Sequence, residues 1–179
     1  MCPAIPGNVA LDRAGLAALD EDTRLRIMSA ALQYVSSDPY RPREGALKWA
    51  LEQAIAGRRA TLQGCLVLPS QDCLIIAREP RAVAGAEGER HDGVTIWDRR
   101  WRITHATGRV AILGVEGIAQ IGAEAPRPRA ALSGLPGLWE GDRLVSCPPL
   151  HWGAPATAMI RAPEGNFPDR LLPDFRLSD

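Results

Sequence analysis

One stretch decides the fold class of this 179-residue chain: Cys65-Leu66-Val67-Leu68-Pro69-Ser70-Gln71-Asp72-Cys73-Leu74-Ile75-Ile76-Ala77. Two short apolar runs flank residues 69–72, which are of types that favour turns. Such a pattern predicts an antiparallel hairpin. The chain before the hairpin has a helical pattern, and the chain after it has further short apolar runs. The sequence therefore predicts an α+β fold.

Residues 9–57, before the hairpin, are expected to be helical. Asp12 and Asp20 are suitable N-caps, because a carboxylate accepts hydrogen bonds from the free amides of a first helical turn. Between residues 22 and 35, apolar side chains recur at steps of three and four. This spacing is typical of a helix with one buried stripe, here made of Leu25, Met28, Leu32 and Val35.

A further helix is expected between the break at residues 36–39 and Gly57. The residue before Pro39 is disfavoured in a helix, whereas Pro42 suits a first turn because its missing amide would have no partner there. Gly57 suits the position just after a helix end. The apolar face of this helix would be Ala46, Leu47, Ala50, Leu51, Ala54 and Ile55.

Short strands are expected after the hairpin, at residues 94–97, 101–104 and 110–113, with 98–100 as a turn. The part from 114 to 179 is rich in Gly and Pro, with a short helical segment near 129–133 and a hairpin around 138–145. The prediction is therefore N-terminal helices followed by a small, mostly antiparallel β domain with a loop-rich C-terminal tail. The expected domains are 1–58 and 59–179.

Composition and charge limit the classes of function. Basic and acidic side chains number 21 each, so the net charge is zero and any attraction to nucleic acid must come from a local patch. Lys48 is the only lysine, and the other basic residues are arginines. No apolar run approaches the length of a membrane span, and the first residues do not resemble a signal peptide. We expect a cytoplasmic protein with no membrane partner.

The cysteines and histidines do not form a recognisable site. Cys2, Cys65, Cys73 and Cys147 are scattered, and free, mostly buried thiols are the default in a reducing compartment. Cys147 and His151 lie four residues apart, a pair that a zinc site or a thiol nucleophile could use. The cysteine spacing does not match that of zinc ribbons. We expect no metal and no catalytic residue in this chain.

Arginine clusters are the remaining lead. The sequence has no Gly-x-x-x-x-Gly-Lys-Ser/Thr loop, and Gly114-Val115-Glu116-Gly117 is explained by a turn after a strand. Arginines interleaved with aromatic residues suit phosphate contact and base stacking. They equally suit a hairpin with one apolar face and solvated arginines. The candidate tRNA-binding residues are Arg41, Arg43, Arg58, Arg59, Arg78, Arg99, Arg100 and Arg102.

An ordered series of phrases carries a family resemblance over nearly the whole chain, strongest from Leu11 to Trp101. The phrases are Leu11-Asp12-Arg13, Thr23-Arg24-Leu25-Arg26, Ala30-Ala31-Leu32-Gln33-Tyr34-Val35-Ser36, Tyr40-Arg41-Pro42-Arg43, Ala60-Thr61-Leu62-Gln63-Gly64-Cys65, Ala77-Arg78-Glu79-Pro80 and Ile96-Trp97-Asp98-Arg99-Arg100-Trp101. Together they resemble the C-terminal half of bacterial tRNA(Ile)-lysidine synthetase, in its alphaproteobacterial form.

The resemblance implies an ATP-dependent, tRNA-modifying ligase. The family adenylates the wobble cytidine of an isoleucine tRNA, and free lysine then displaces AMP to give lysidine. An N-terminal domain holds ATP, with Mg, on a Ser-Gly-Gly-x-Asp-Ser loop that this chain lacks. The chain is therefore expected to be the tRNA-recognising portion, inactive alone and completed by that domain in cis or in trans. The alternative is a stand-alone RNA- or protein-binding module without catalysis.

Overall fold

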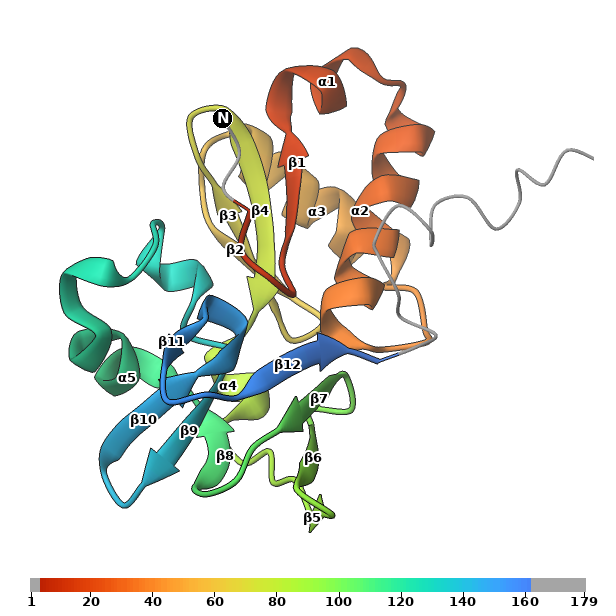
Figure 1. Ribbon diagram of the computed structural model, residues 1–179. Helices are drawn as coiled ribbons and strands as arrows, with labels where there is room; N and C mark the ends of the chain where they lie inside the picture. Colours follow the sequence, from red (N-terminus) through yellow and green to blue (C-terminus); the bar gives the residue numbers. More distant parts are fainter. Residues whose placement is uncertain (1–3, 162–179) are drawn as a thin grey trace, which may run out of the picture.

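The computed structural model describes residues 4–161 and confirms the α+β class. Within these residues, three small antiparallel sheets of four strands are combined with five α-helices (Figure 1). None of these helices has the length and apolar character that crossing a membrane would require. The helices are α1 (Arg13–Ala18), α2 (Glu21–Ser36), α3 (Glu44–Ile55), α4 (Pro80–Val83) and α5 (Gly114–Ile121).

The first sheet contains the predicted hairpin. Its strand order is β1-β4-β3-β2, with β1 (Val9–Asp12), β2 (Ala60–Leu62), β3 (Cys65–Pro69) and β4 (Cys73–Arg78). The Ser70 amide donates to the Cys73 carbonyl at 2.7 Å and closes the turn. The helical expectation for residues 9–12 is wrong: they pair with β4, with Val9 opposite Ile76. Backbone hydrogen bonds to a strand far along the chain override the local pattern there.

The predicted helix boundaries are largely confirmed. Asp12 caps α1 by accepting from the Gly15 amide, and Asp20 caps α2 by accepting from the Thr23 amide at 2.9 Å. Helix α3 begins two residues after Pro42, and Gly57, at φ +73°, lies just beyond its end. A positive φ is a conformation that glycine adopts without steric cost.

Two further sheets follow. One has the order β12-β7-β6-β5 and the other β11-β10-β9-β8. The expected strands at 94–97 and 101–104 are confirmed as β6 and β7. The strands are β5 (Arg90–His91), β6 (Val94–Trp97), β7 (Trp101–Thr104), β8 (Arg109–Ile112), β9 (Pro136–Glu140), β10 (Arg143–Cys147), β11 (Trp152–Gly153) and β12 (Thr157–Ile160).

Two expectations for the later part of the chain need correction. The segment read as a turn at 114–117 begins helix α5, which buries Ile118 and Ile121. The region expected to be loop-rich contributes β11 and β12 to two sheets, and the tail beyond residue 161 lies outside the described residues. The hairpin at 138–145 is confirmed as β9 and β10, and the segment near 129–133 contains the 3-10 turn Arg129–Ala131.

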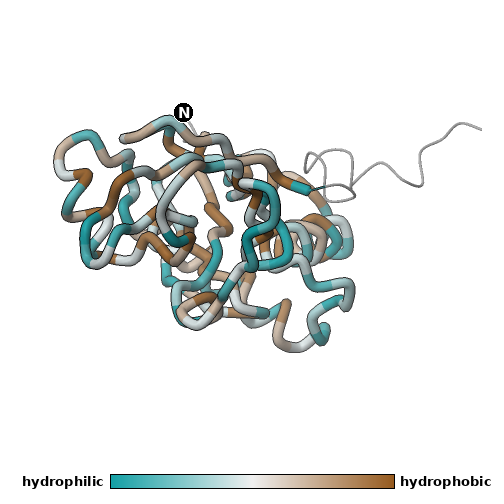
Figure 2. The backbone as a smooth tube through the Cα atoms, turned by 60° about the horizontal axis from the view of Figure 1, so that its bottom comes forward, coloured by the Kyte–Doolittle hydropathy of each residue, from teal (hydrophilic) through white to brown (hydrophobic). Residues whose placement is uncertain are grey.

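The first sheet is shared by two apolar clusters. Leu74 and Ile76 of β4 pack with helices α2 and α3, whereas Ile75 and Ala77 pack with the core of the two later sheets. Every residue of β4 is buried. In Figure 1, helices α2 and α3 lie at the upper right, whereas the later sheets lie below them together with α4 and α5. Hydrophilic segments lie mainly in outer loops in Figure 2. The packing therefore does not divide at residue 58.

Candidate nucleic-acid interface

Arg78 lies inside the molecule and joins two sheets. Its Nε and Nη2 donate to the two carboxylate oxygens of Asp98 at 2.7 and 2.9 Å, and its Nη1 donates to the Gly64 carbonyl at 2.8 Å. The side chains of Arg78 and Asp98 are only 9% and 6% exposed. Burial opposes the charged form, but the hydrogen bonds and charge of Asp98 raise the pKa of Arg78. This guanidinium is occupied and offers nothing to RNA.

Arg100 is also buried, at 1% exposure. Its Nη2 donates to the Gly7 carbonyl at 2.8 Å, and its guanidinium stacks near the rings of Tyr34 and Trp101, at 5.4 and 5.6 Å from their centroids. Burial lowers the pKa of Arg100. The sequence predicts both Arg78 and Arg100 as tRNA contacts, and their burial removes both from the candidate interface.

Arg41 and Arg43 are exposed on the loop between α2 and α3. Tyr40 in this loop is 80% exposed. The loop is held from both sides: Gln33 Nε2 donates to the Pro39 carbonyl at 2.9 Å, and Gln63 Nε2 donates to the Tyr40 carbonyl at 2.6 Å. The loop therefore presents an aromatic ring and two arginines on a fixed backbone.

Arg99 lies on the turn between β6 and β7, near enough to this loop for its charge to act on Asp38. Asp38 of the loop accepts from the Tyr40 amide at 2.9 Å. The pKa of Asp38 is lowered first by that hydrogen bond, then by a hydrogen bond with Gln63 and, to a lesser extent, by the charges of Arg99 and Arg78. Asp98 and Arg99 both adopt positive φ, at 48° and 59°, and Asp98 anchors the turn through Arg78. We define the arginine patch as Tyr40, Arg41, Arg43 and Arg99.

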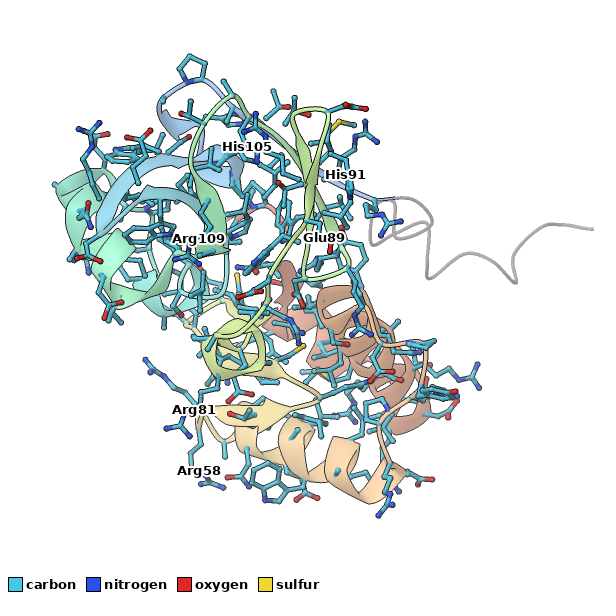
Figure 3. All side chains as sticks on the ribbon, turned by 90° about the horizontal axis from the view of Figure 1, so that it is seen from below. Arg58, Arg81, Glu89, His91, His105 and Arg109 are labelled. Carbon is cyan, nitrogen blue, oxygen red and sulfur yellow. The ribbon has the colours of Figure 1, made fainter. Side chains whose placement is uncertain are left out.

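The remaining predicted residues lie elsewhere. Arg102 is exposed on β7 opposite Met159, which is 64% exposed. Arg58 and Arg59 follow the other end of α3, about 18 Å from its start for a helix of 12 residues. In Figure 3, Arg58 points outward on the same side of the molecule as Arg81, a residue that the sequence analysis did not single out.

Arg161 is a second arginine that the sequence analysis missed. Its amide donates to the Arg100 carbonyl at 2.8 Å, and its Nη1 donates to the Arg99 carbonyl at 3.4 Å. It therefore adds positive charge beside the turn that carries Arg99. No pattern among the residues next to Arg161 predicts its contact with the turn, because Arg161 reaches the turn only through the pairing of β12 with β7.

Thiol and metal chemistry find no support in the described part of the chain. Among residues 4–161, no group of three or more His, Cys, Asp or Glu side chains could hold a metal ion. Burial raises the pKa of the Cys65 and Cys147 thiols to about 12, so neither is a thiolate at neutral pH. His151 is exposed while Cys147 is buried. Cys73 is disulfide-bonded, so the expectation of free thiols is wrong for this residue.

Comparison with known proteins supports the family resemblance. No family model and no solved structure matches the chain. It is 28% identical over 171 residues to a tRNA(Ile)-lysidine synthase of Ruegeria pomeroyi, and the aligned region covers 93% of this chain and 40% of that protein. A tRNA(Ile)-lysidine synthase of a Methylobacterium species is 37% identical over 89 residues, covering 44% of this chain and 25% of that protein. The chain thus resembles the Ruegeria synthase over nearly its whole length, and the matches span less than half of either synthase.

Proposed function

We propose that this chain is the tRNA-recognising C-terminal portion of a tRNA(Ile)-lysidine synthetase, which converts the wobble cytidine of isoleucine tRNA to lysidine. Its similarity to two tRNA(Ile)-lysidine synthases supports the class of reaction. ATP, Mg and free lysine would be handled by an N-terminal ATP-binding domain, joined in cis or in trans. This chain would contribute binding and orientation of the tRNA, and no catalytic residue.

The arginine patch carries the proposal for tRNA binding. Guanidinium groups contact phosphates in a bidentate manner, and an exposed aromatic ring can stack on a base. Arg41, Arg43 and Arg99 are exposed and come from two different elements, which lets them follow a curved backbone. Because the net charge is zero, a fixed local cluster is the feature that would attract an RNA.

The test is binding of an isoleucine tRNA transcript to the chain, measured by fluorescence anisotropy at several salt concentrations. We expect the combined variant Arg41→Ala, Arg43→Ala, Arg99→Ala to weaken binding at least about tenfold. It should also make binding less dependent on salt. The slope of the logarithm of the binding constant against the logarithm of the salt concentration should fall by about one for each phosphate that an arginine no longer binds. The matched control is Arg26→Ala, Arg127→Ala, Arg143→Ala, which removes the same charge from exposed positions outside the patch.

Equal weakening in the two triple variants would show that only overall charge matters and would contradict the assignment of the patch. Binding that does not change with salt, or no binding of the transcript, would contradict the proposed function and favour the stand-alone module. Tyr40 gives a second readout: Tyr40→Phe keeps the ring and should bind like the wild type, whereas Tyr40→Ala should bind more weakly.

A further inference from the structure

A groove of about 330 Å³ lies at the other end of the molecule from the helices α2 and α3. The residues that line it include Arg109 and Ala111 of β8, Trp139 of β9, Glu116 and Asp142. Arg109 and Trp139 are directly opposite each other in the strand pair, so their side chains share one face of the sheet. The volume is within the range of small-ligand sites, about 300–1,000 Å³.

Trp139 is held in a fixed position against this sheet. Its Nε1 donates to the Ile112 carbonyl at 3.2 Å. The ring lies over two glycines, and a Cβ added to Gly117 or Gly137 would approach the indole to 3.1 Å. The same added Cβ atoms would come still closer to Leu113, at 2.5 Å from Gly117, and to Leu144, at 2.8 Å from Gly137. The two glycines therefore make room for a packed group of side chains that includes the indole. The half-buried indole then presents its remaining surface to the groove.

The charged groups of the groove are also on fixed elements. Glu116 belongs to the first turn of α5, and Asp142 to the turn between β9 and β10. Gln120 of α5 ties this turn down: its Nε2 donates to the Asp142 carbonyl at 3.0 Å, and its Oε1 accepts from the Leu144 amide at 2.8 Å. Within residues 4–161, none of the side-chain charges of Arg109, Glu116 and Asp142 forms an ion pair. Figure 3 shows Arg109 well away from Arg58 and Arg81.

We propose that this groove binds one unpaired guanosine nucleotide of an RNA. The indole of Trp139 would stack on the base, and the Arg109 guanidinium would contact the phosphate. Ionised carboxylates only accept hydrogen bonds, and guanine presents two neighbouring donors, N1–H and the exocyclic amino group, to Glu116 and Asp142. The choice of RNA rests on the proposed function, but the groove itself is separate from the arginine patch.

The test uses guanosine 5′-monophosphate as the probe and follows the indole N–H signal of Trp139 by NMR. The chain has five tryptophans, so the signal is assigned by its loss in Trp139→Phe. We expect millimolar guanosine 5′-monophosphate to shift this signal. Inosine 5′-monophosphate, which lacks only the exocyclic amino group, should bind about tenfold more weakly, as expected when a hydrogen bond to a charged group is missing.

Two exposed-site variants identify the groups that bind the nucleotide. Arg109→Ala should weaken both nucleotides equally, and Glu116→Gln with Asp142→Asn should remove the preference for guanosine. Arg26→Ala, on the exposed surface of α2, is the control and should bind like the wild type.

Equal affinity for the two nucleotides in the wild type, or no shift of the Trp139 signal, would overturn the assignment of the groove. Since free nucleotides are used, this result is independent of tRNA binding. A groove that fails while the transcript still binds leaves the proposed function in place.

Discussion

The buried ion pair of Arg78 and Asp98 is the clearest example of a role set by single side chains. A run of arginines and aromatics in a sequence suggests contact with nucleic acid. The structure shows that Arg78 and Arg100 instead join the turn at 98–100 to the first sheet and to Gly7. By doing so they fix Arg99, their exposed neighbour, in the arginine patch. The interior arginines therefore position the interface without touching RNA.

Replacing Asp98 by asparagine should strongly destabilise the fold. The variant keeps the size of the side chain and suits the positive φ at this position. It leaves the Arg78 charge buried without its partner, which typically costs about 3–5 kcal/mol. The free energy of unfolding in urea measures the effect.

Asp22→Asn is the matched control, because it removes the charge from an exposed pair with Arg26, in which the side chains are 67% and 71% exposed. Exposed pairs of this kind contribute little. Equal stability of Asp98→Asn and wild type would show that the pair does not hold the turn.

At the scale of elements, helix α2 depends on its N-cap and on its packing. Asp20 accepts from the Thr23 amide at 2.9 Å and from the Thr23 hydroxyl at 2.7 Å. The first of these bonds satisfies a backbone amide that the first helical turn leaves without a partner. The helix then places the buried side chains of Met28 and Leu32 against the first sheet. Its far end leads into the loop that carries Tyr40 and Arg41, so stability at the cap affects how the interface is held.

Asp20→Ala should lower the melting temperature at neutral pH, and the difference should disappear in acid. The hydrogen bond from the Thr23 side chain is the main cause of the lowered pKa of Asp20. A carboxylate with a lowered pKa in the folded state stabilises above the unfolded value of 3.8, and this contribution is lost as pH falls through the folded value. Melting curves from neutral to strongly acid pH measure it.

Glu52→Ala, on the exposed surface of α3, serves as the control for Asp20→Ala. A difference between Asp20→Ala and wild type that stays constant across this pH range would rule out the ionised cap as its cause.

At the scale of the whole molecule, the first sheet links two cores. Helices α2 and α3 cover one face, and the cluster that contains Trp97, Trp101 and Leu135 covers the other. The expected domains 1–58 and 59–179 would separate the helices from the sheet on which they pack. They would also remove β1 from its pairing with β4. The arginine patch spans the same junction, because its residues come from both sides of that division.

A chain beginning at residue 59 should therefore not remain a folded monomer. Without the helices, Val67, Leu74 and Ile76 would lose the apolar surface that buries them. We expect aggregation in size-exclusion chromatography and loss of dispersed NMR signals, compared with the full chain. A fragment 59–179 that stays monomeric with native-like signals would show that the two parts fold independently.

Local features of the sequence were enough to predict α2, α3 and the hairpins at 65–77, 94–104 and 138–145. Helical periodicity, caps and turn residues act over a few positions, so they can be recognised without a structure. The same holds for the exposed arginines of the loop at 41–43. The family resemblance also came from the order of short phrases, and the comparisons with two synthases agree with it.

Only the tertiary structure decided the features that depend on distant partners. Strand β1 exists because residues 9–12 meet β4, more than 60 positions later. Which arginines are buried depends on Asp98 and Gly7, and the groove around Trp139 depends on Gly117 of α5. Burial and pairing are set by the whole packed chain rather than by neighbouring residues. For that reason the sequence identified the arginines, while the fold determined which of them can face an RNA.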